Sequence, residues 1–525
     1  MARVHPHAGL PLLPQALLAV AAGLAQAASL AWPWSGEPLW WLQLLSLALL
    51  AGLVRPHVRE AIAWRRGALA GGLFATAWLA GTFWWLFISM HVYGGLAAPL
   101  TVAAVLGLAA FLASYYAVAL GLFCLLAPAS KALAALLFGA LWLLAELARG
   151  TLWTGFPWGA GGYAHVDGPL AVLAPHVGVY GIGAVAAALA MTAVQGRGAD
   201  LRNGRAWAGA IVLAAALLAL HQAGRPQGQG RMLTLELLQG NIPQDEKFQS
   251  GSGVPVALKW YADRLQDARA ELVVAPETAI PLLPQQLLPG YLEGIEQRYA
   301  QGTQAALVGI PLGDEARGYT NSVLGLSGAA APYRYDKHHL VPFGEFIPPF
   351  FKWFTAMMNI PLGDFNRGAV GQPSFAWGQQ RIAPNICYED LFGEELGARF
   401  IDPAQAPTVF VNLSNIGWFG NTVAIDQHLH ISRMRALEFA RPMVRATNTG
   451  ATAIIDHRGV VTHQLERHTR GVLRGTVQGR GLGGGEVTPY AWWVSRWGLW
   501  PLWILGGAAL AWAFLARRLR AARGL

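Results

Sequence analysis

Three segments of the chain place chemically reactive residues directly after runs that favour β-strands. Glu277 follows the apolar start of VVAPETAIP, Lys337 lies in YRYDKHHLVPFGEFIP, and Cys387 follows RIAPNI. A thiol becomes a nucleophile when it loses its proton, a carboxylate can accept that proton, and an ammonium can stabilise an oxyanion. Together, these residue types supply what an acyl transfer requires.

Each of these residues has a simpler interpretation when it is taken alone. Glu277 could be a surface turn residue, Lys337 a solvated charge, and Cys387 a small buried apolar residue. The only other cysteine, Cys124, lies in an apolar run, where we expect it to be structural. Cys387 differs because a strand gives way to a helix there, so we expect the helix dipole to lower the pKa of its thiol.

The composition indicates that much of the chain lies in a membrane. Of the 525 residues, 54% are hydrophobic and only 13% are charged, whereas about 25% of an average soluble protein is charged. The 22 tryptophans fit a protein with membrane interfaces. Two cysteines cannot form a disulfide framework, and their spacing matches no zinc motif.

Eight apolar runs form candidate membrane helices, and most approach the roughly 20 residues that a crossing requires. They cover residues 10–32, 38–54, 67–89, 97–127, 132–148, 169–194, 206–222 and 497–516. Basic residues follow the second, fourth, sixth and eighth runs and are nearly absent from the loops between. The positive-inside rule then predicts both termini in the cytoplasm and the long stretch after run seven outside. The net charge of +9 thus reflects topology and does not indicate nucleic acid as a partner.

Two other interpretations of the apolar runs are less favoured. The sequence AQAAS at the end of the first run resembles a signal-peptide cleavage site, but the segment is long and its start is weakly basic. A transporter usually carries ionisable residues inside its spans, and these runs hold almost none beyond Glu146.

The stretch from about 231 to 485 predicts one α/β domain, because strand-like runs alternate there with amphipathic helices. Helices are expected near 256–270 and 288–301, and a hairpin turn at Arg458–Gly459. The strand-like runs are MLTLELLQG (232–240), ELVVAPE (271–277), AALVGIPL (305–312), NSVLGL (321–326), RIAPNICYE (381–389) and PTVFVNLSN (407–415). GRGLGGGE at 479–486 reads as a hinge.

The motifs PETAIP, DKHHLVPFGEF and ICYED resemble the Glu–Lys–Cys segments of the nitrilase superfamily. Together with the apolar runs, GFPWGAGGY at 155–163 and SRMRALEFARPMVRATNTG at 432–450 resemble the apolipoprotein N-acyltransferase family over nearly the whole chain. The resemblance implies about eight membrane helices and a periplasmic nitrilase-like domain, an αββα sandwich, in a bacterial inner membrane. We therefore divide the chain into N-terminal transmembrane helices (1–225, about seven), the catalytic domain (231–485), and a last transmembrane helix with a basic tail (490–525).

The resemblance also assigns roles to site residues. Cys387 would be the nucleophile, Glu277 the general base and Lys337 an oxyanion stabiliser. Glu345 would orient Lys337 or the incoming amine, and the backbone N–H of Tyr388 would donate to the oxyanion.

Other residues receive weaker assignments. Glu389 could support the site or equally be a surface acid at a helix start. The aromatic-rich segments 343–365 and 281–291 are expected to enter the outer leaflet or to pack against the helices. Phe248 stands where members of the family often have tryptophan. The residues expected to touch lipid or substrate are Phe248, Phe350, Phe351, Trp353, Met357, Met358 and Trp418.

The implied reaction is a ping-pong transfer. Cys387 would take an acyl chain from a phospholipid of the phosphatidylethanolamine or phosphatidylglycerol class, and the amine of a diacylglyceryl-cysteine apolipoprotein would then receive it. We expect a monomer that needs no cofactor. We also expect no metal site, since His428 and His430 have no clearly spaced third ligand. The alternatives are a membrane-tethered carbon–nitrogen hydrolase, in which water replaces the amine, and a transporter or lipoprotein-binding scaffold.

Overall fold

The computed structural model describes residues 11–55, 63–196, 219, 229–329, 331–348, 365–481 and 487–522. The chain divides into two compact units, which are described separately. The first comprises Met1–Trp84, Val102–Ala223 and Leu499–Leu525, and the second comprises Trp85–Thr101 and Gly224–Gly498.

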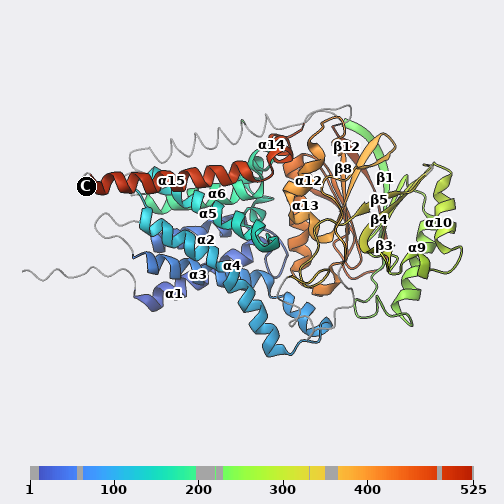
Figure 1. Cartoon of the computed structure of the whole chain (residues 1–525), viewed down its shortest axis with the longest axis horizontal. Helices are drawn as coiled ribbons and strands as arrows, with labels where there is room; N and C mark the ends of the chain where they lie inside the picture. Colours follow the sequence, from blue (N-terminus) through green and yellow to red (C-terminus); the bar gives the residue numbers. More distant parts are fainter. Residues whose placement is uncertain are drawn as a thin grey trace, which may run out of the picture. The chain divides into compact units, whose positions relative to one another are not determined.

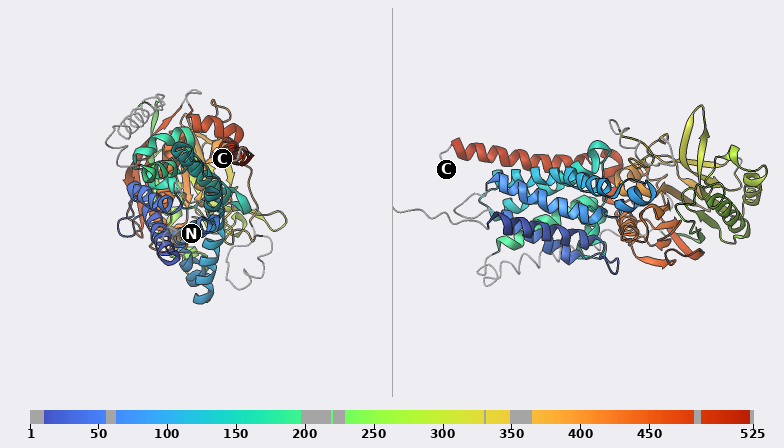
Figure 2. Two further views of the ribbon diagram at one scale, coloured as in Figure 1. Left: turned by 90° about the vertical axis from the view of Figure 1, so that its left-hand side faces the viewer. Right: turned by 90° about the horizontal axis from the view of Figure 1, so that it is seen from below.

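The first unit consists of apolar helices that lie side by side (Figures 1 and 2). Small residues allow some of them to approach closely. A Cβ atom on Gly23 would lie 2.2 Å from the carbonyl oxygen of Phe74, and one on Gly139 would lie 2.7 Å from that of Ala184, which is the packing that small residues permit between membrane helices. The described α-helices are α1 (Leu12–Leu30), α2 (Trp40–Val54), α3 (Trp64–Phe83), α4 (Ala98–Leu126, in this unit from Val102 onward), α5 (Lys131–Thr151), α6 (Ala174–Gln195) and α15 (Trp500–Ala522).

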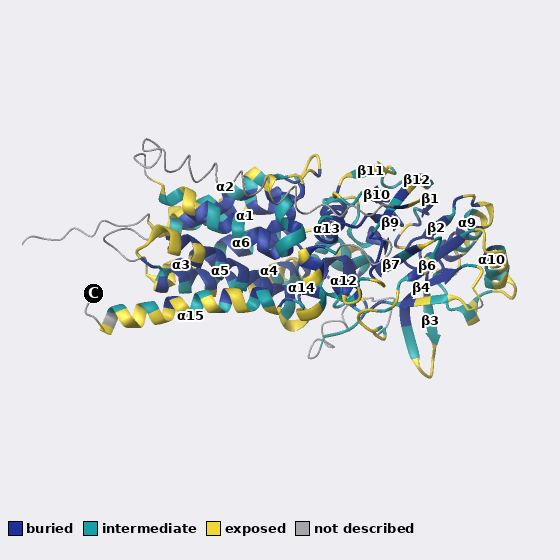
Figure 3. Ribbon diagram, turned by 90° about the horizontal axis from the view of Figure 1, so that it is seen from above, coloured by how far each residue is buried: buried dark blue, intermediate teal, exposed yellow. Residues whose placement is uncertain are grey.

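The prediction of several membrane helices is confirmed. Among the described residues, the helices long and apolar enough to cross a membrane are Leu12–Leu30, Ala98–Leu126, Lys131–Thr154, Pro169–Gln195 and Trp500–Arg520. Large apolar side chains of α15 such as Ile504 and Leu505 are about two-thirds exposed, and Figure 3 shows this helix exposed along much of its length. A surface of this kind is suited to lipid. All of the expected run 206–222 except Ala219 lies outside the described residues.

The described part of the second unit contains two six-stranded sheets. The first sheet has the order β12 (Gly471–Arg480), β1 (Gln229–Gln239), β2 (Leu272–Ala275), β3 (Ala305–Asp314), β4 (Gly318–Leu326), β5 (Tyr333–Asp336). The second has the order β11 (Val461–Gln464), β10 (Ala453–Ile455), β9 (Met443–Thr447), β8 (Val409–Ser414), β7 (Gln380–Ile386), β6 (Phe375–Trp377). In each sheet three adjacent strands are parallel, β1–β2–β3 and β7–β8–β9, and antiparallel strands flank them.

Successive side chains of a strand point to opposite faces of its sheet. Each sheet therefore has one face toward the other sheet and one face toward the helices that cover it. Val274 of β2 and Val411 of β8 belong to the core between the two sheets. Val273 belongs to a second core with α9 and α10. On the outer face of the other sheet, the ring of Phe410 packs 5.4 Å from that of Phe439 in α13. The result is an αββα sandwich, as predicted (Figure 1). Its helices include α9 (Gly253–Asp267), α10 (Tyr291–Ala300), α12 (Gly393–Gly397), α13 (Ala424–Phe439) and α14 (Pro489–Trp497).

The strand ends bring polar loops together. β2, β5, β7 and β8 are followed, within one or two residues, by Glu277, Lys337, Cys387 and Asn415. The expected turn at Arg458–Gly459 is confirmed between β10 and β11, where Gly459 has a φ of 74°. In open parallel arrangements, sites form at the carboxyl ends of strands, and this is where the candidate residues lie.

Candidate active site

Lys337 lies between two carboxylates in the interior of the second unit. Its Nζ atom is 2.9 Å from the carboxylate of Glu345 and 3.4 Å from Oε1 of Glu277. Lys337 is fully buried, and both acids are nearly so. Burial opposes the charged form of the lysine, but Glu345, Glu277 and Cys387 outweigh it and hold the pKa of Lys337 above its ordinary value. A permanently charged ammonium therefore occupies the site.

Hydrogen bonds fix the carboxylate of Glu277. Asn321 donates to Oε1 at 2.7 Å, and the backbone N–H of Asn415 donates to Oε2 at 2.8 Å. Lys247 is also buried and donates to the backbone oxygen of Glu277 at 3.0 Å. Burial raises the pKa of Glu277, but the two ammonium groups and these hydrogen bonds lower it more, so its pKa lies below the ordinary value. The acid is therefore ionised and able to accept a proton.

Glu345 is held from three sides. Asn321, which also binds Glu277, donates to Glu345 Oε1 at 2.8 Å. The backbone N–H of Val341 donates to its other oxygen at 2.8 Å. With Lys337 as the third partner, the carboxylate has little freedom to rotate. This geometry fits the expected orienting role, which remains a prediction.

Cys387 begins a short 3₁₀ turn, Cys387–Leu391, and adopts a left-handed backbone conformation with φ of 51°, which is uncommon for a residue other than glycine. Ser414 donates to its sulfur at 3.3 Å. Burial, followed by the charge of Glu277, raises the pKa of the Cys387 thiol to about 12, although Lys337 opposes this. The expectation of a lowered pKa was wrong, because burial and a nearby carboxylate outweigh the favourable groups. The resting residue is a thiol.

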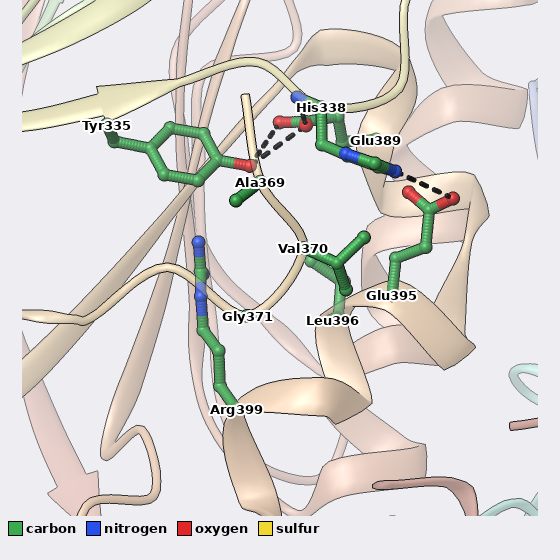
Figure 4. A pocket seen from close by; sticks show the side chains of 9 residues that line it. All are labelled: Tyr335, His338, Ala369, Val370, Gly371, Glu389, Glu395, Leu396 and Arg399. Carbon is green, nitrogen blue, oxygen red and sulfur yellow. Dashed lines mark hydrogen bonds and ion pairs between the residues drawn. The ribbon is translucent and has the colours of Figure 1, made fainter. Parts of the chain in front are cut away.

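Glu389 connects the turn that begins at Cys387 with the segment that follows Lys337. Its carboxylate accepts hydrogen bonds from the backbone N–H groups of Ile386 at 2.7 Å and His338 at 2.6 Å. The hydroxyl of Tyr335 donates to both carboxylate oxygens, at 2.9 and 2.8 Å. Only 3% of Glu389 is exposed, so the interpretation as a surface acid was wrong. Figure 4 shows Tyr335 and Glu389 at one edge of a small pocket that is lined in addition by His338 and Glu395.

Tyr388 lies directly after the cysteine, and its side chain is buried. Its ring packs at 5.3 Å from that of Phe392 and at 5.7 Å from His339. These contacts hold the turn that follows Cys387. The predicted use of the backbone N–H of Tyr388 as an oxyanion donor remains a prediction.

Two of the residues expected to contact lipid or substrate are described by the structure. Trp418, in the turn Ile416–Phe419, packs its ring 5.7 Å from that of Tyr93. The ring of Phe248 lies 5.9 Å from the ammonium of Lys247, which places it next to the buried site. The others, Phe350, Phe351, Trp353, Met357 and Met358, lie outside the described residues.

Several polar residues at the site were not found from the sequence. Asn321 binds both acids, Asn415 binds Glu277, and Asn412 and His428 bind the carbonyl of Cys387. The three asparagines could have been found, because each lies inside or directly after an apolar strand. A buried amide at such a position needs hydrogen-bond partners. His428 gave no such signal.

The sequence model described as "Carbon-nitrogen hydrolase" matches residues 237–482, a range that holds Glu277, Lys337 and Cys387. The model of the "Apolipoprotein N-acyltransferase N-terminal domain" matches residues 22–192. The chain is 72% identical to the apolipoprotein N-acyltransferase of Verminephrobacter eiseniae over 98% of both chains. It is 49% identical to that of Ralstonia nicotianae over 84% of both, and 41% identical to that of Bordetella bronchiseptica over 92% of this chain and 94% of the other. The chain therefore belongs to the apolipoprotein N-acyltransferase family.

Proposed function

We propose that this chain transfers an acyl chain from a membrane phospholipid to the N-terminal amine of diacylglyceryl-cysteine apolipoproteins, through a thioester on Cys387. The observation that carries the proposal is the buried position of Lys337 between Glu277 and Glu345. The thiol of Cys387 interacts electrostatically with all three residues. The family to which the chain belongs supplies the class of reaction.

In the first half of the cycle, the sulfur of Cys387 attacks the ester carbonyl of the phospholipid. The thiol proton passes to Glu277 as the S–C bond forms, because a thiol with a raised pKa is not ionised before the substrate arrives. Lys337 and the backbone N–H of Tyr388 stabilise the oxyanion. The C–O bond then breaks, Glu277 returns the proton to the leaving alkoxide, and a lysophospholipid departs.

In the second half, the amine of the apolipoprotein attacks the thioester. Glu277 accepts a proton from the attacking nitrogen, the C–S bond breaks, and the sulfur leaves to become a thiol again. The product is an amide at the N-terminus of a triacylated lipoprotein. Glu345 keeps Lys337 oriented in both halves, because its carboxylate binds the ammonium directly. Excluding water protects the thioester.

We further propose that the donor is a phospholipid of the phosphatidylethanolamine or phosphatidylglycerol class and that the enzyme is a monomer. The catalytic region, 231–485, lies in the periplasm. In the sequence it stands between the N-terminal transmembrane helices of 1–225 and the single transmembrane helix and basic tail of 490–525, and both termini are cytoplasmic. The distribution of basic residues supports this orientation. Phe248 and Trp418 contact lipid or substrate, as do Phe350, Phe351, Trp353, Met357 and Met358.

The second candidate is a membrane-tethered carbon–nitrogen hydrolase, because the match over residues 237–482 is to a hydrolase family. In that case water would resolve the acyl-enzyme. The long apolar helices favour the transferase, since a water-soluble amide or nitrile does not require them.

Incubation of the purified full chain with a phospholipid that carries a tagged acyl chain tests the first half of the cycle. The tag should become bound to the protein, be released by hydroxylamine, and map to Cys387. Cys387→Ser should carry no hydroxylamine-labile tag, whereas Cys124→Ser, the matched change at the other cysteine, should be labelled normally. An unlabelled wild type, or equal labelling of Cys387→Ser, rules out the thioester.

A further inference from the structure

The carbonyl oxygen of Cys387 accepts hydrogen bonds from two buried side chains. Nδ2 of Asn412, in β8, lies 3.0 Å from it, and Nε2 of His428, in α13, lies 3.2 Å from it. Both side chains are completely buried. Neither has a role in the cycle above, so their convergence on the cysteine backbone requires an explanation.

The position of the proton on His428 follows from its neighbours. Its Nδ1 atom lies 3.1 Å from the guanidinium of Arg445, and a guanidinium can only donate. Nδ1 is therefore the acceptor, and the ring donates through Nε2. This N–H points at both the carbonyl of Cys387 and Oδ1 of Asp390, which lies 3.0 Å away.

The ring of His428 is locked in that orientation by a closed network. Arg445 pairs with Oδ2 of Asp390 at 3.2 Å. Ser432 donates to the same carboxylate and accepts from Arg445. The four side chains of this His428 network are completely buried. Because each member contacts at least two others, the ring cannot rotate without breaking several buried hydrogen bonds.

Asn412 is held in a comparable way. Its amide nitrogen donates to Oδ1 of Asn385 at 2.7 Å as well as to the carbonyl of Cys387. Asn385 in turn donates to the backbone oxygen of Val411 at 3.3 Å. The amide of Asn412 has two N–H bonds, and these two partners use both. The two hydrogen bonds restrict the orientation of the amide.

The carbonyl of Cys387 and the N–H of Tyr388 belong to the same peptide group. That group is planar, and its C=O and N–H bonds point in opposite directions when it is trans. A carbonyl held by two fixed donors therefore sets the direction of the N–H on the other side. The need for such support is clear, because the left-handed φ of Cys387 is an unfavourable conformation for this residue.

We propose that Asn412 and the His428 network are positioning residues for the N–H of Tyr388, which binds the oxyanion. Hydrogen bonds donated to the carbonyl also polarise the peptide group, which makes its N–H a stronger donor. This inference rests on the proposed function, since it concerns the oxyanion of the acylation step. It adds residues from β8, β9 and α13 to that step.

Two reactions of the same sulfur separate this role from a merely structural one. Acylation by phospholipid places negative charge on a carbonyl oxygen. Alkylation by iodoacetamide forms an S–C bond while iodide leaves, and no oxyanion develops. His428→Phe and Asn412→Leu should slow acylation about 10- to 100-fold, less than the roughly 10²–10³-fold that follows loss of an oxyanion donor itself. In both variants Cys387 should be alkylated at the wild-type rate. Mass spectrometry of the peptide that contains Cys387 measures this rate.

Two further variants serve as controls. His428→Gln retains an N–H donor at a similar reach and should keep most of the acylation rate. His430→Phe makes the same replacement on the same helix, at a ring whose nitrogen contacts Arg433 at 3.4 Å, and should leave both reactions unchanged. If His428→Phe is not recovered as folded protein, Asn412→Leu and His428→Gln carry the test.

Either of two results overturns the inference. Normal acylation in His428→Phe and Asn412→Leu would show that the carbonyl contacts do not matter for the oxyanion. An equal fall in acylation and alkylation would show that the contacts only maintain the fold of the turn. Failure of the proposed function would look different, because the wild type itself would then form no thioester.

Discussion

The ammonium of Lys337 lies 2.9 Å from the carboxylate of Glu345, at a position where the lysine has no exposed surface. A buried ion pair of this kind is a poor source of stability, because both charges lose their hydration. Its value lies in chemistry. Glu345 holds the ammonium in place and charged, while Glu277, 3.4 Å from the same nitrogen, is bound by two asparagines and an additional lysine.

Glu345→Gln should slow formation of the thioester about 10- to 100-fold, because the amide cannot hold the ammonium of Lys337 as the carboxylate does. The rate is measured with the tagged phospholipid in single turnover. Glu293→Gln, an exposed acid on α10, is the matched control and should react at the wild-type rate. Wild-type kinetics in Glu345→Gln would remove this residue from the mechanism.

Alkylation of Cys387 by iodoacetamide should show no inflection near the ordinary thiol pKa of 9.0, because the pKa of this thiol is raised to about 12. A thiol with a raised pKa stays protonated as the pH rises, so alkylation should remain slow from about pH 7 to about pH 10. A clear rise in rate centred near pH 9 would contradict the raised pKa of this thiol.

Glu277→Gln should lower the pKa of the Cys387 thiol, so that alkylation becomes fast at a lower pH than in the wild type. The carboxylate of Glu277 disfavours the thiolate, and a neutral amide removes this effect while Lys337 continues to favour it. The same variant should lose acylation, since no base accepts the thiol proton. An unchanged alkylation profile would show that Glu277 does not act on the sulfur.

Glu389→Gln should lower the free energy of unfolding of the catalytic unit by about 2–3 kcal/mol. The carboxylate accepts from the N–H groups of Ile386 and His338 and from the hydroxyl of Tyr335, whereas an amide turns its own N–H bonds toward one of these donors. Thermal unfolding of the full chain in detergent measures the loss. Glu315→Gln, at an exposed turn, is the control, and equal stability of the two variants would contradict the bridging role of Glu389.

The proposed topology predicts different accessibility for two single cysteines in a background that lacks Cys124 and Cys387. A cysteine at Glu315, in the catalytic unit, should react in intact cells with a thiol reagent that cannot cross membranes. A cysteine at Arg65, which is exposed near the start of α3, should react only after the cells are broken. Labelling of both positions in intact cells would contradict the orientation.

The sequence predicts much of the αββα unit, because its strands carry strong local signals. In β2 every residue is buried, so the strand appears as a short apolar run that ends at a polar turn. The same signal located the turn after β7 and with it Cys387. The helix α13 was missed for the opposite reason. Fourteen of its 16 residues are buried, and they include charged and polar side chains such as His428, Arg435 and Glu438. Apolar residues therefore do not gather on one face, and the amphipathic pattern by which helices are recognised is missing.

The electrostatics of the site were harder to predict. Pairing of Glu277 with Asn321 depends on strands β2 and β4, which do not neighbour each other in the sheet. The pKa of Cys387 depends on burial and on Glu277, more than 100 positions earlier in the chain. A local rule about helix dipoles could not include either effect, and it gave the wrong direction for the pKa shift.

The transfer of one acyl chain can be followed from sulfur to nitrogen. Enzyme that carries the tagged acyl chain on Cys387 is separated from phospholipid and mixed with a diacylglyceryl-cysteine peptide, and both the tag on the protein and its products are measured over time. We predict that the tag leaves Cys387 at the rate at which it appears as an amide on the peptide. Release of the tag as free fatty acid at the same rate with and without peptide would contradict the transferase and favour the hydrolase.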